Sequence, residues 1–345
     1  MNRPAHDQIH YLYEQPPAHG AAHQVAPGLF WVRLPLPLAL DHVNVWVADD
    51  GDGWTIVDCG LDTEPARAAW EALQKGLLYG RKVRRLVATH GHPDHIGMAR
   101  SIVGNQTAPF VATAIEWETA VRAHAEAGLE IPTAQVEFLV RHGYSSEAAA
   151  KRSGFGRIIG PLMPSPPPLD EVIADAQIIR FGQRDWRVII AGGHAPEHAS
   201  FYCEADHILI AGDQILPRIT PFIGVNFREP ESDPLHTYLE SLALFDMLPD
   251  DTLVLPGHGL PFRGLPQRLR QLRDHHDERL AKIVTGLEAP KHAFDVARDL
   301  FPRAIGTGHE RLAMSESIAH LNFLMHRGRI ERVHDRAGTL RFSRG

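Results

Sequence analysis

The segment THGHPDHI, residues 89–96, constrains the fold of this chain most strongly, because it places three histidines and one aspartate within six residues. The chain has 22 histidines, so a polar, histidine-rich loop is the simpler interpretation. The alternative is a metal site, since imidazole nitrogens and carboxylate oxygens are ligands of zinc-type ions. One short loop can supply only about half of the ligands that two metal ions need. A metal site therefore requires further ligands from distant segments to converge on this loop.

Three further candidates stand at the ends of predicted strands. His194 follows the apolar run DWRVIIAGG, Asp213 follows ILIAG, and His258 follows LVLPG. Each leaves an apolar strand next to a glycine. Other histidines lack this context, for example those at positions 6, 10, 19, 23, 275 and 309. The pattern favours a metal centre at converging strand ends.

Periodicity and turn signals predict a mixture of strands and helices. Apolar residues alternate across 43–47 before the turn DDGDG and the apolar run WTIV, which is typical of a β-hairpin. Thr63 is a plausible N-cap for a helix, and residues 83–90 read as a strand ending at His90. Strands interleaved with helices and hairpins, without one repeated βαβ unit, predict an α+β fold with sheets sandwiched between helices.

We expect a leader over residues 1–27, a catalytic domain over 28–264 with a helical insertion over about 114–163, and a separate domain over 265–345. The charge supports the last boundary, since there are 20 basic and 32 acidic residues through Gly264 but 15 basic and 10 acidic from Leu265. The final part reads as three helices closed by a hairpin, the outline of a winged helix. His276 lies on the apolar stripe of the first helix and is predicted to be a core histidine.

The order THGHPDH, GGH, AGD and PGH resembles the metallo-β-lactamase fold superfamily of metal-dependent hydrolases over roughly residues 28–264. The resemblance implies an αβ/βα sandwich with two metal sites that share one bridging carboxylate. The implied ligands of the first metal are His90, His92 and His194, those of the second are Asp94, His95 and His258, and Asp213 bridges the two.

The resemblance also implies supporting residues. Asp58, in TIVDCG, matches the family's early strand-end aspartate, which supports the ligand loop from outside the coordination sphere. Many members read GHTPGH where this chain has GHAPEH, so Ala195 and Glu197 depart from the pattern. His198 is retained as a structural partner, and Glu197 is expected to face solvent. The C-terminal block resembles the winged-helix appendage of a branch that includes thioesterase-like and RNA-cleaving enzymes.

Two such metals can share a hydroxide that attacks an ester, thioester, amide or phosphodiester. Asp94 is the candidate catalytic residue, because it can both bind metal and accept the proton of the attacking water; the alternative is that it is purely a ligand. Five imidazoles and two carboxylates without a thiolate suit two zinc ions. Manganese and iron also fit such a site.

The segment QILPRITPFIGVNF, which follows Asp213, is apolar apart from Arg218 and Arg228 and is expected to border the cavity. An apolar wall suits a small acyl substrate, so a thioesterase or esterase, with lactones included, is the leading hypothesis. A metal-dependent endoribonuclease is the second, although the expected recognition helix, HERLAMSESIAHLNFLMHR, has few basic residues. A non-enzymatic, DNA-binding winged-helix regulator is the third. The residues that contact the substrate stay unknown at this level.

The bulk properties exclude several other classes. The net charge of −7 argues against a general nucleic-acid or membrane-surface binder. Cys59 and Cys203 lie in apolar runs and indicate buried thiols rather than a disulfide framework. We find no secretory signal and no run of about 20 apolar residues, so the cytoplasm is the expected location. Homodimerisation through the C-terminal domain is a further expectation.

Overall fold

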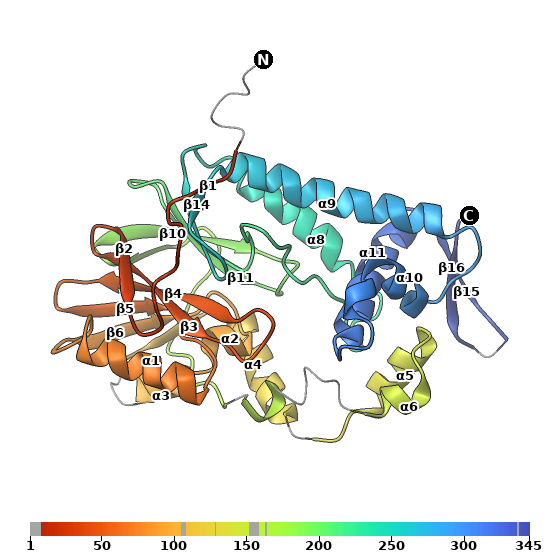
Figure 1. Ribbon diagram of the computed structural model, residues 1–345, viewed down its shortest axis with the longest axis horizontal. Coiled ribbons are helices and arrows are strands. Elements are labelled where there is room, and N and C mark those ends of the chain that lie inside the picture. Colours follow the sequence, from red (N-terminus) through yellow and green to blue (C-terminus); the bar gives the residue numbers. More distant parts are fainter. Residues whose placement is uncertain (1–7, 105–107, 128, 152–158, 163, 337) are drawn as a thin grey trace, which may run out of the picture. The chain divides into compact units, whose positions relative to one another are not determined.

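The computed structural model describes residues 8–104, 108–127, 129–151, 159–162, 164–336 and 338–345 (Figure 1). The chain divides into two compact units, which we describe separately. Unit 1 comprises residues 1–127, 159–221 and 243–269, and unit 2 comprises residues 128–158, 222–242 and 270–345. These limits differ from the expected domains, because the boundary near the C-terminal part falls inside a helix and two earlier segments join unit 2.

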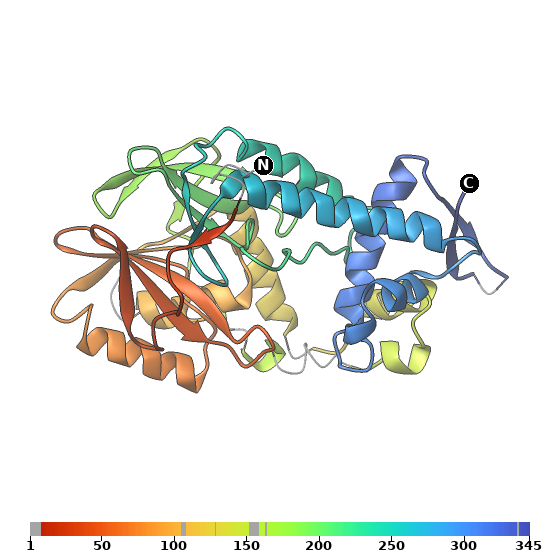
Figure 2. The ribbon, with the colours of Figure 1, turned by 45° about the horizontal axis from the view of Figure 1, so that its top comes forward.

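Unit 1 is built on two seven-stranded sheets (Figure 2). In the first sheet the strand order is β1 (His10–Tyr11), β14 (Phe262–Arg263), β13 (Leu253–Pro256), β12 (Ile208–Gly212), β11 (His198–Cys203), β10 (Arg184–Ala191) and β9 (Ile178–Phe181). In the second it is β2 (Ala22–Ala26), β3 (Leu29–Pro35), β4 (His42–Asp49), β5 (Gly53–Val57), β6 (Lys82–Val87), β7 (Phe110–Ala112) and β8 (Glu171–Val172).

An apolar core joins the two sheets. Trp31 and Trp46 of the second sheet are buried in the same cluster as Trp186 and Phe201 of the first. Side chains of β4 and β5 are buried on both faces of their sheet, apart from the partly exposed Asp49 at the end of β4. This layered arrangement confirms the predicted sandwich of mixed sheets and helices.

Helices of unit 1 lie against the second sheet. Figure 1 shows α1 (Glu64–Lys75) and α3 (Ala99–Gly104) along its outer face, and α2 (Pro93–Ile96) and α4 (Ala114–Glu126) follow β6 and β7 in the chain. The predicted helix start is present, because the Thr63 hydroxyl accepts a hydrogen bond from the Ala66 backbone N–H at 3.3 Å. The predicted hairpin is also present as the antiparallel pair β4–β5.

Strand direction determines where polar residues gather. The pairs β5–β6 and β12–β13 are parallel, so the carboxyl ends within each pair lie at the same edge of their sheet. His90 follows β6, while Asp213 and His258 follow β12 and β13. The fold therefore brings to one edge the segments that the sequence places up to 168 residues apart.

The segment expected to be a leader contributes to both sheets. Its β1 pairs with β14, where Tyr11 lies opposite Phe262, and its β2 pairs with β3. The pairing gives this segment backbone hydrogen bonds that a detached leader would lack. Residues 8–27 are therefore part of the sandwich.

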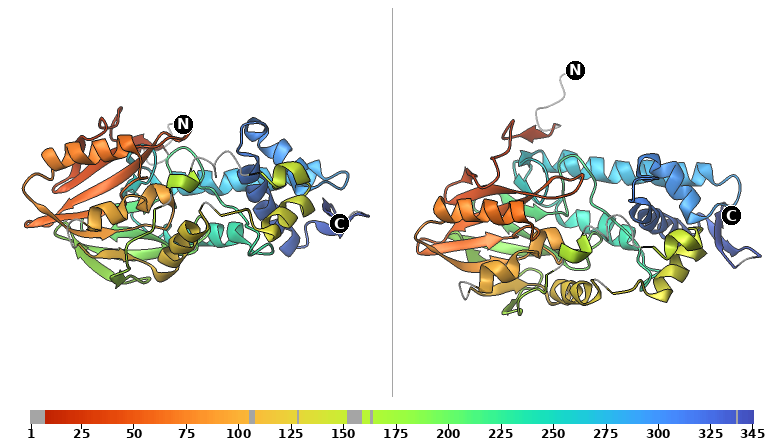
Figure 3. Two further views of the ribbon diagram at one scale, coloured as in Figure 1. Left: turned by 90° about the horizontal axis from the view of Figure 1, so that it is seen from below. Right: turned by 60° about the horizontal axis from the view of Figure 1, so that its bottom comes forward.

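Unit 2 is mainly helical (Figure 3). It contains α5 (Thr133–Arg141), α6 (Ser146–Ala149), α8 (Pro234–Ser241), most of α9 (Leu265–Gly286), α10 (Ala293–Leu300), α11 (Glu310–His326) and the hairpin β15 (Glu331–His334)–β16 (Leu340–Ser343). Short 3₁₀ turns occur at Gly160–Leu162 in unit 1, at Leu242–Leu244 on the boundary of the units and at Pro302–Ala304 in unit 2. The three predicted helices and the hairpin are present, and the winged-helix assignment stays a prediction.

Two further expectations concern these helices. His276 is fully buried in unit 2 with its Nδ1 atom 3.2 Å from His320 Nε2, as a core histidine would be. The expected insertion over 114–163 is shared between the units, since α4 belongs to unit 1 while α5 and α6 belong to unit 2. Within the described residues, we find no helix whose length and apolarity would let it cross a bilayer.

Candidate metal centre

All seven predicted ligands meet in unit 1 at the strand ends. The first group is His90, His92 and His194, whose ligand atoms lie within 4.8 Å of one another. His90 Nε2 is 2.9 Å from His92 Nδ1 and 3.2 Å from His194 Nε2. A hydrogen bond between two of these imidazoles would need a proton on one of the two facing nitrogens. One metal ion placed among the three nitrogens could instead bind all of them.

The second group contains the carboxylates. His258 Nε2 is 3.4 Å from Asp94 Oδ2 and 3.2 Å from Asp213 Oδ2, and His95 Nε2 is 3.4 Å from Asp213 Oδ1. Asp213 Oδ2 is also 3.6 Å from His194 Nε2, a member of the first group. Asp213 thus touches both groups with its two oxygens, as a bridging ligand would.

Two buried atoms face each other without forming a hydrogen bond, as atoms that share a cation would. His95 Nε2 and Asp213 Oδ1 lie 3.4 Å apart, and neither makes a hydrogen bond to any described residue. Buried polar atoms rarely lack partners, because burying an unpaired donor or acceptor costs about 1–3 kcal/mol. A set of imidazoles and carboxylates suits divalent ions such as zinc, manganese or iron. These residues therefore fit the dinuclear site that the sequence predicts.

The electrostatics of the two groups differ. Burial and the neighbouring His194 imidazole lower the pKa of His92 to about 3, and burial holds the pKa of His90 well below its usual value. Burial alone would also lower the pKa of His258, but the carboxylates of Asp213 and Asp94 raise it to about 10. The first group therefore offers neutral nitrogens, while in the second the protons held by His95 and His258 balance the two carboxylates, and a bound cation would take the place of those protons.

Asp58 orients part of the ligand loop. Its carboxylate accepts hydrogen bonds from the Thr89 backbone N–H at 2.8 Å, from the Thr89 hydroxyl at 2.8 Å and from His95 Nδ1 at 2.7 Å. The last bond keeps the proton of His95 on Nδ1 and turns Nε2 toward Asp213. Asp58 itself has a φ of 60°, in the left-handed region, so the backbone is held in a costly conformation at this strand end.

His198, predicted to be a structural partner, contacts the backbone of Asp213, the predicted bridging aspartate. Its Nε2 atom accepts a hydrogen bond from the backbone N–H of Asp213 at 3.0 Å, and its ring is fully buried. Glu197 contributes its backbone rather than its carboxylate to the neighbourhood of the site.

His42 is a supporting residue that the sequence analysis missed. Its backbone carbonyl accepts a hydrogen bond from His258 Nδ1 at 2.6 Å, which leaves Nε2 of His258 for the metal centre. Its own Nε2 accepts the Gly259 backbone N–H at 2.8 Å, so its proton lies on Nδ1, 2.7 Å from Asp41. Its position at the first residue of a strand could have suggested this role only if the pairing of distant loops were known.

Glu116 is the second missed residue. It lies in the first turn of α4, is 2% exposed, and accepts backbone N–H groups from Gly91 and Glu197, each at 2.8 Å. Gly91 lies between two ligands of the first loop, and Glu197 lies three residues after His194. One carboxylate therefore braces both loops that carry the first group of ligands. Burial raises the pKa of Glu116, which the two backbone donors partly oppose.

A cavity of about 340 Å³ borders the metal centre. His258 and Gly259 form part of its wall. The remaining lining residues are Glu14, Pro16, Arg33, Leu40, His42, Pro217, Arg218, Ile219 and Leu260. Its volume lies near the lower end of the range of about 300–1,000 Å³ that is typical of small-molecule sites.

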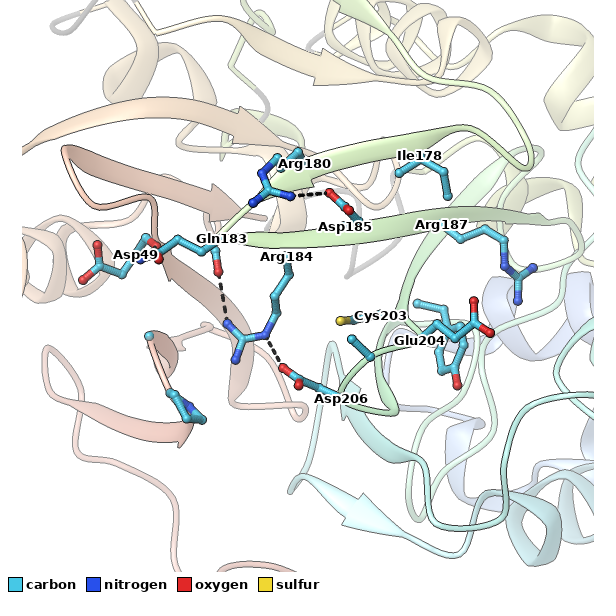
Figure 4. Close-up of a pocket in the computed structure, with 15 residues that line it drawn as sticks. Asp49, Ile178, Arg180, Gln183, Arg184, Asp185, Arg187, Cys203, Glu204 and Asp206 are labelled. Atoms are coloured by element: carbon cyan, nitrogen blue, oxygen red, sulfur yellow. Dashed lines mark hydrogen bonds and ion pairs between the residues drawn. The ribbon is translucent and has the colours of Figure 1, made fainter.

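A second hollow of about 920 Å³ lies at another place on unit 1, between the β9–β10 hairpin and the β11–β12 turn (Figure 4). Arg180 pairs with Asp185 at 2.8 Å and Arg184 with Asp206 at 2.6 Å. Its charges are largely matched from within, and none of the predicted ligands lines it. We therefore assign the functional site to the smaller cavity.

Comparison with known proteins agrees with the geometry. Residues 38–258 match the metallo-beta-lactamase superfamily, and residues 280–345 match the metallo-beta-lactamase-like C-terminal domain. The chain therefore belongs to the metallo-beta-lactamase superfamily and is a metallo-hydrolase of that class.

Particular relatives span most of the chain. It is 27% identical over 310 residues to a probable metallo-hydrolase of Bacillus subtilis, covering 85% of this chain and 91% of the relative. The structure of a beta-lactamase domain protein from Burkholderia ambifaria is 36% identical, with a TM-score of 0.87 and 99% coverage of both chains. A hydroxyacylglutathione hydrolase of Chromohalobacter salexigens is 36% identical over 105 residues, which cover 30% of this chain and 38% of that protein.

Proposed function

We propose that this metallo-hydrolase cleaves a small acyl substrate, a thioester or an ester, with lactones included, at a centre of two divalent ions, zinc fitting best. The observation that carries the proposal is the 340 Å³ cavity, in which one metal ligand, His258, shares a wall with apolar side chains. An acyl chain in this cavity can contact Pro217, Ile219 and Leu260. Its acyl carbon would then lie near the ion that His258 is proposed to bind.

Divalent ions in such a centre supply an activated water and polarise the acyl oxygen. Burial favours the neutral acid of Asp94, yet the His95 and His258 imidazoles hold its pKa below the usual value. The ionised Asp94 carboxylate can accept a proton from the water that attacks the acyl carbon. The bond to sulfur or oxygen then breaks, and the leaving group takes up a proton as thiol or alcohol.

Two considerations favour acyl transfer over RNA cleavage. Two relatives are named hydroxyacylglutathione hydrolase, which supports acyl chemistry for this chain. A groove that follows a phosphate backbone needs clustered lysines and arginines. Among the described residues that line the cavity, Arg33 and Arg218 are the only two basic ones besides histidine, and Arg33 is already paired with Asp41 at 3.1 Å.

The test combines metal content with a substrate panel. We expect about two zinc ions per chain by elemental analysis, fewer in Asp94→Ala, and the full content in Asp185→Ala, a matched aspartate of the 920 Å³ hollow. The zinc-loaded protein should hydrolyse thioesters, esters or lactones and the Asp94→Ala variant should not. Zinc-loaded protein that cleaves RNA and none of these acyl compounds would overturn the proposal.

A further inference from the structure

The cavity beside His258 contains one guanidinium group that the fold positions without neutralising it. Arg218 is exposed, and its Nε–H donates to the Tyr11 hydroxyl at 3.3 Å while its guanidinium lies 5.0 Å from the centre of the Tyr11 ring. In the described part of the chain, no carboxylate forms an ion pair with Arg218. Its terminal N–H groups are therefore available to a ligand.

The other arginine of the cavity differs in this respect. Arg33 Nη2 contacts Asp41 Oδ1 at 3.1 Å, and the same carboxylate accepts the Nδ1–H of His42. Arg33 thus helps to hold His42 in place and, through His42, the loop that carries His258. Of the two guanidinium groups that line the cavity, only Arg218 lacks an acidic partner within the described residues.

The anchor of Arg218 is fixed by backbone pairing. Tyr11 belongs to β1, which pairs with β14, and the next residue, Leu12, donates its backbone N–H to the Pro261 carbonyl at 3.3 Å. Pro261 directly follows Leu260, which lines the cavity. Because Tyr11 is tied to this wall, the guanidinium that stacks on it is held at the cavity rather than swinging freely in solvent.

We propose that Arg218 binds a carboxylate on the acyl part of the substrate, so that the substrate class is a monoanionic acyl compound such as a monoester or monothioester of a dicarboxylic acid. This inference rests on the proposed acyl hydrolysis and names its substrate class. A planar guanidinium with free terminal donors matches a carboxylate in a two-point contact. The apolar Pro217, Ile219 and Leu260 then contact the chain between the carboxylate and the acyl carbon.

Glu14 limits how much negative charge the cavity accepts. Its carboxylate lines the same cavity and is exposed. A second anionic group on the ligand would meet this carboxylate and be repelled. The arrangement therefore favours one carboxylate over a polyphosphate or a nucleic acid.

Binding of stable amide analogues tests the inference independently of turnover. The probes are N-butyl succinamate, which carries one carboxylate, and N-butyl butyramide, its neutral counterpart, each titrated calorimetrically into the zinc-loaded full chain. We expect the succinamate to bind at least tenfold more tightly, because charged hydrogen bonds of this kind are worth roughly a factor of ten or more. In Arg218→Gln this preference should fall to about twofold or less, and Arg218→Lys should retain part of it.

A matched control is available in Arg187→Gln, because Arg187 also lies over a tyrosine ring, at 5.6 Å from the centre of Tyr202, but lines the other hollow (Figure 4). This variant should keep the full preference. Equal affinity for both amides in the wild-type protein, or a preference that persists in Arg218→Gln, would overturn the inference. Absence of hydrolysis on the acyl panel would instead contradict the proposed function, while the binding comparison would still decide the role of Arg218.

Discussion

Replacing Glu116 by glutamine tests how the two ligand loops are held. The substitution keeps the size of the side chain but exchanges one acceptor oxygen for an NH₂ group. Glu116 accepts the backbone N–H groups of Gly91 and Glu197, each at 2.8 Å, so the amide can satisfy only one of them. The other N–H would face a donor in a buried place.

The expected loss of zinc affinity follows from these two hydrogen bonds. A hydrogen bond to a charged group contributes about 1.5–3 kcal/mol, and the lost bond is the one that aligns a ligand loop. Both loops supply the first group, His90, His92 and His194, so we expect zinc affinity at that group to fall by about 10- to 100-fold, as is typical for supporting residues. The second group should lose less, because His258 lies on a distant segment and His95, although it follows Gly91 by only four residues, is also held by Asp58.

The assay is zinc competition against a chelator of known affinity, resolved into two binding steps. Glu118→Gln is the matched control, because Glu118 lies on the same helix, is exposed and carries the same charge. We expect the zinc affinity of one of the two binding steps to fall in Glu116→Gln, and the affinity of neither step to fall in Glu118→Gln. Two unchanged steps in Glu116→Gln, each within about twofold of the wild-type value, would refute the view that Glu116 braces the centre.

Three further predictions concern other positions, two near the metal centre and one in the core of unit 2. Asp58→Asn should weaken zinc binding at the second group by about tenfold, seen in the same competition assay, because His95 loses the carboxylate that fixes its tautomer. Gly257→Ala should abolish binding of one ion by elemental analysis, since a Cβ there would lie 2.2 Å from Asp213 Oδ1. Burial lowers the pKa of His276 to about 2, so the folded state cannot take up the proton that the unfolded chain binds below about pH 6.5, and stability is lost as the pH falls. We therefore expect the free energy of unfolding of His276→Leu, measured with denaturant, to fall by about 2 kcal/mol less between pH 6.5 and pH 5 than that of the wild type. Equal decreases in the two proteins would contradict this.

Local patterns were sufficient for much of the fold. The hairpin at β4–β5, the helix that begins after Thr63 and the strand that precedes His90 all follow from alternation, capping and turn residues, although that strand ends at Val87 and not at His90 as predicted. The spacing of apolar residues within one element indicates which of its faces is buried, and this spacing can be read from neighbouring residues alone. The limits of the units did not follow, because the division inside α9 depends on packing between distant segments.

The sequence by itself determined the donor chemistry of the site. Seven imidazole and carboxylate side chains at strand ends could be named from their neighbours, because a polar ligand that follows an apolar strand beside a glycine is visible in one dimension. It also indicated His198 and Asp58 as supports, through the resemblance to a known family.

Only the tertiary structure decided what surrounds these ligands. Glu116 and His42 carry no local signal of their roles, because each acts through backbone groups of loops that lie far away in the chain. The contact of Arg218 with Tyr11 joins residues 207 positions apart and depends on the pairing of β1 with β14. Metal ligands are set by residue type, which a sequence states directly, whereas support and substrate selection are set by distances between segments, which arise only on folding.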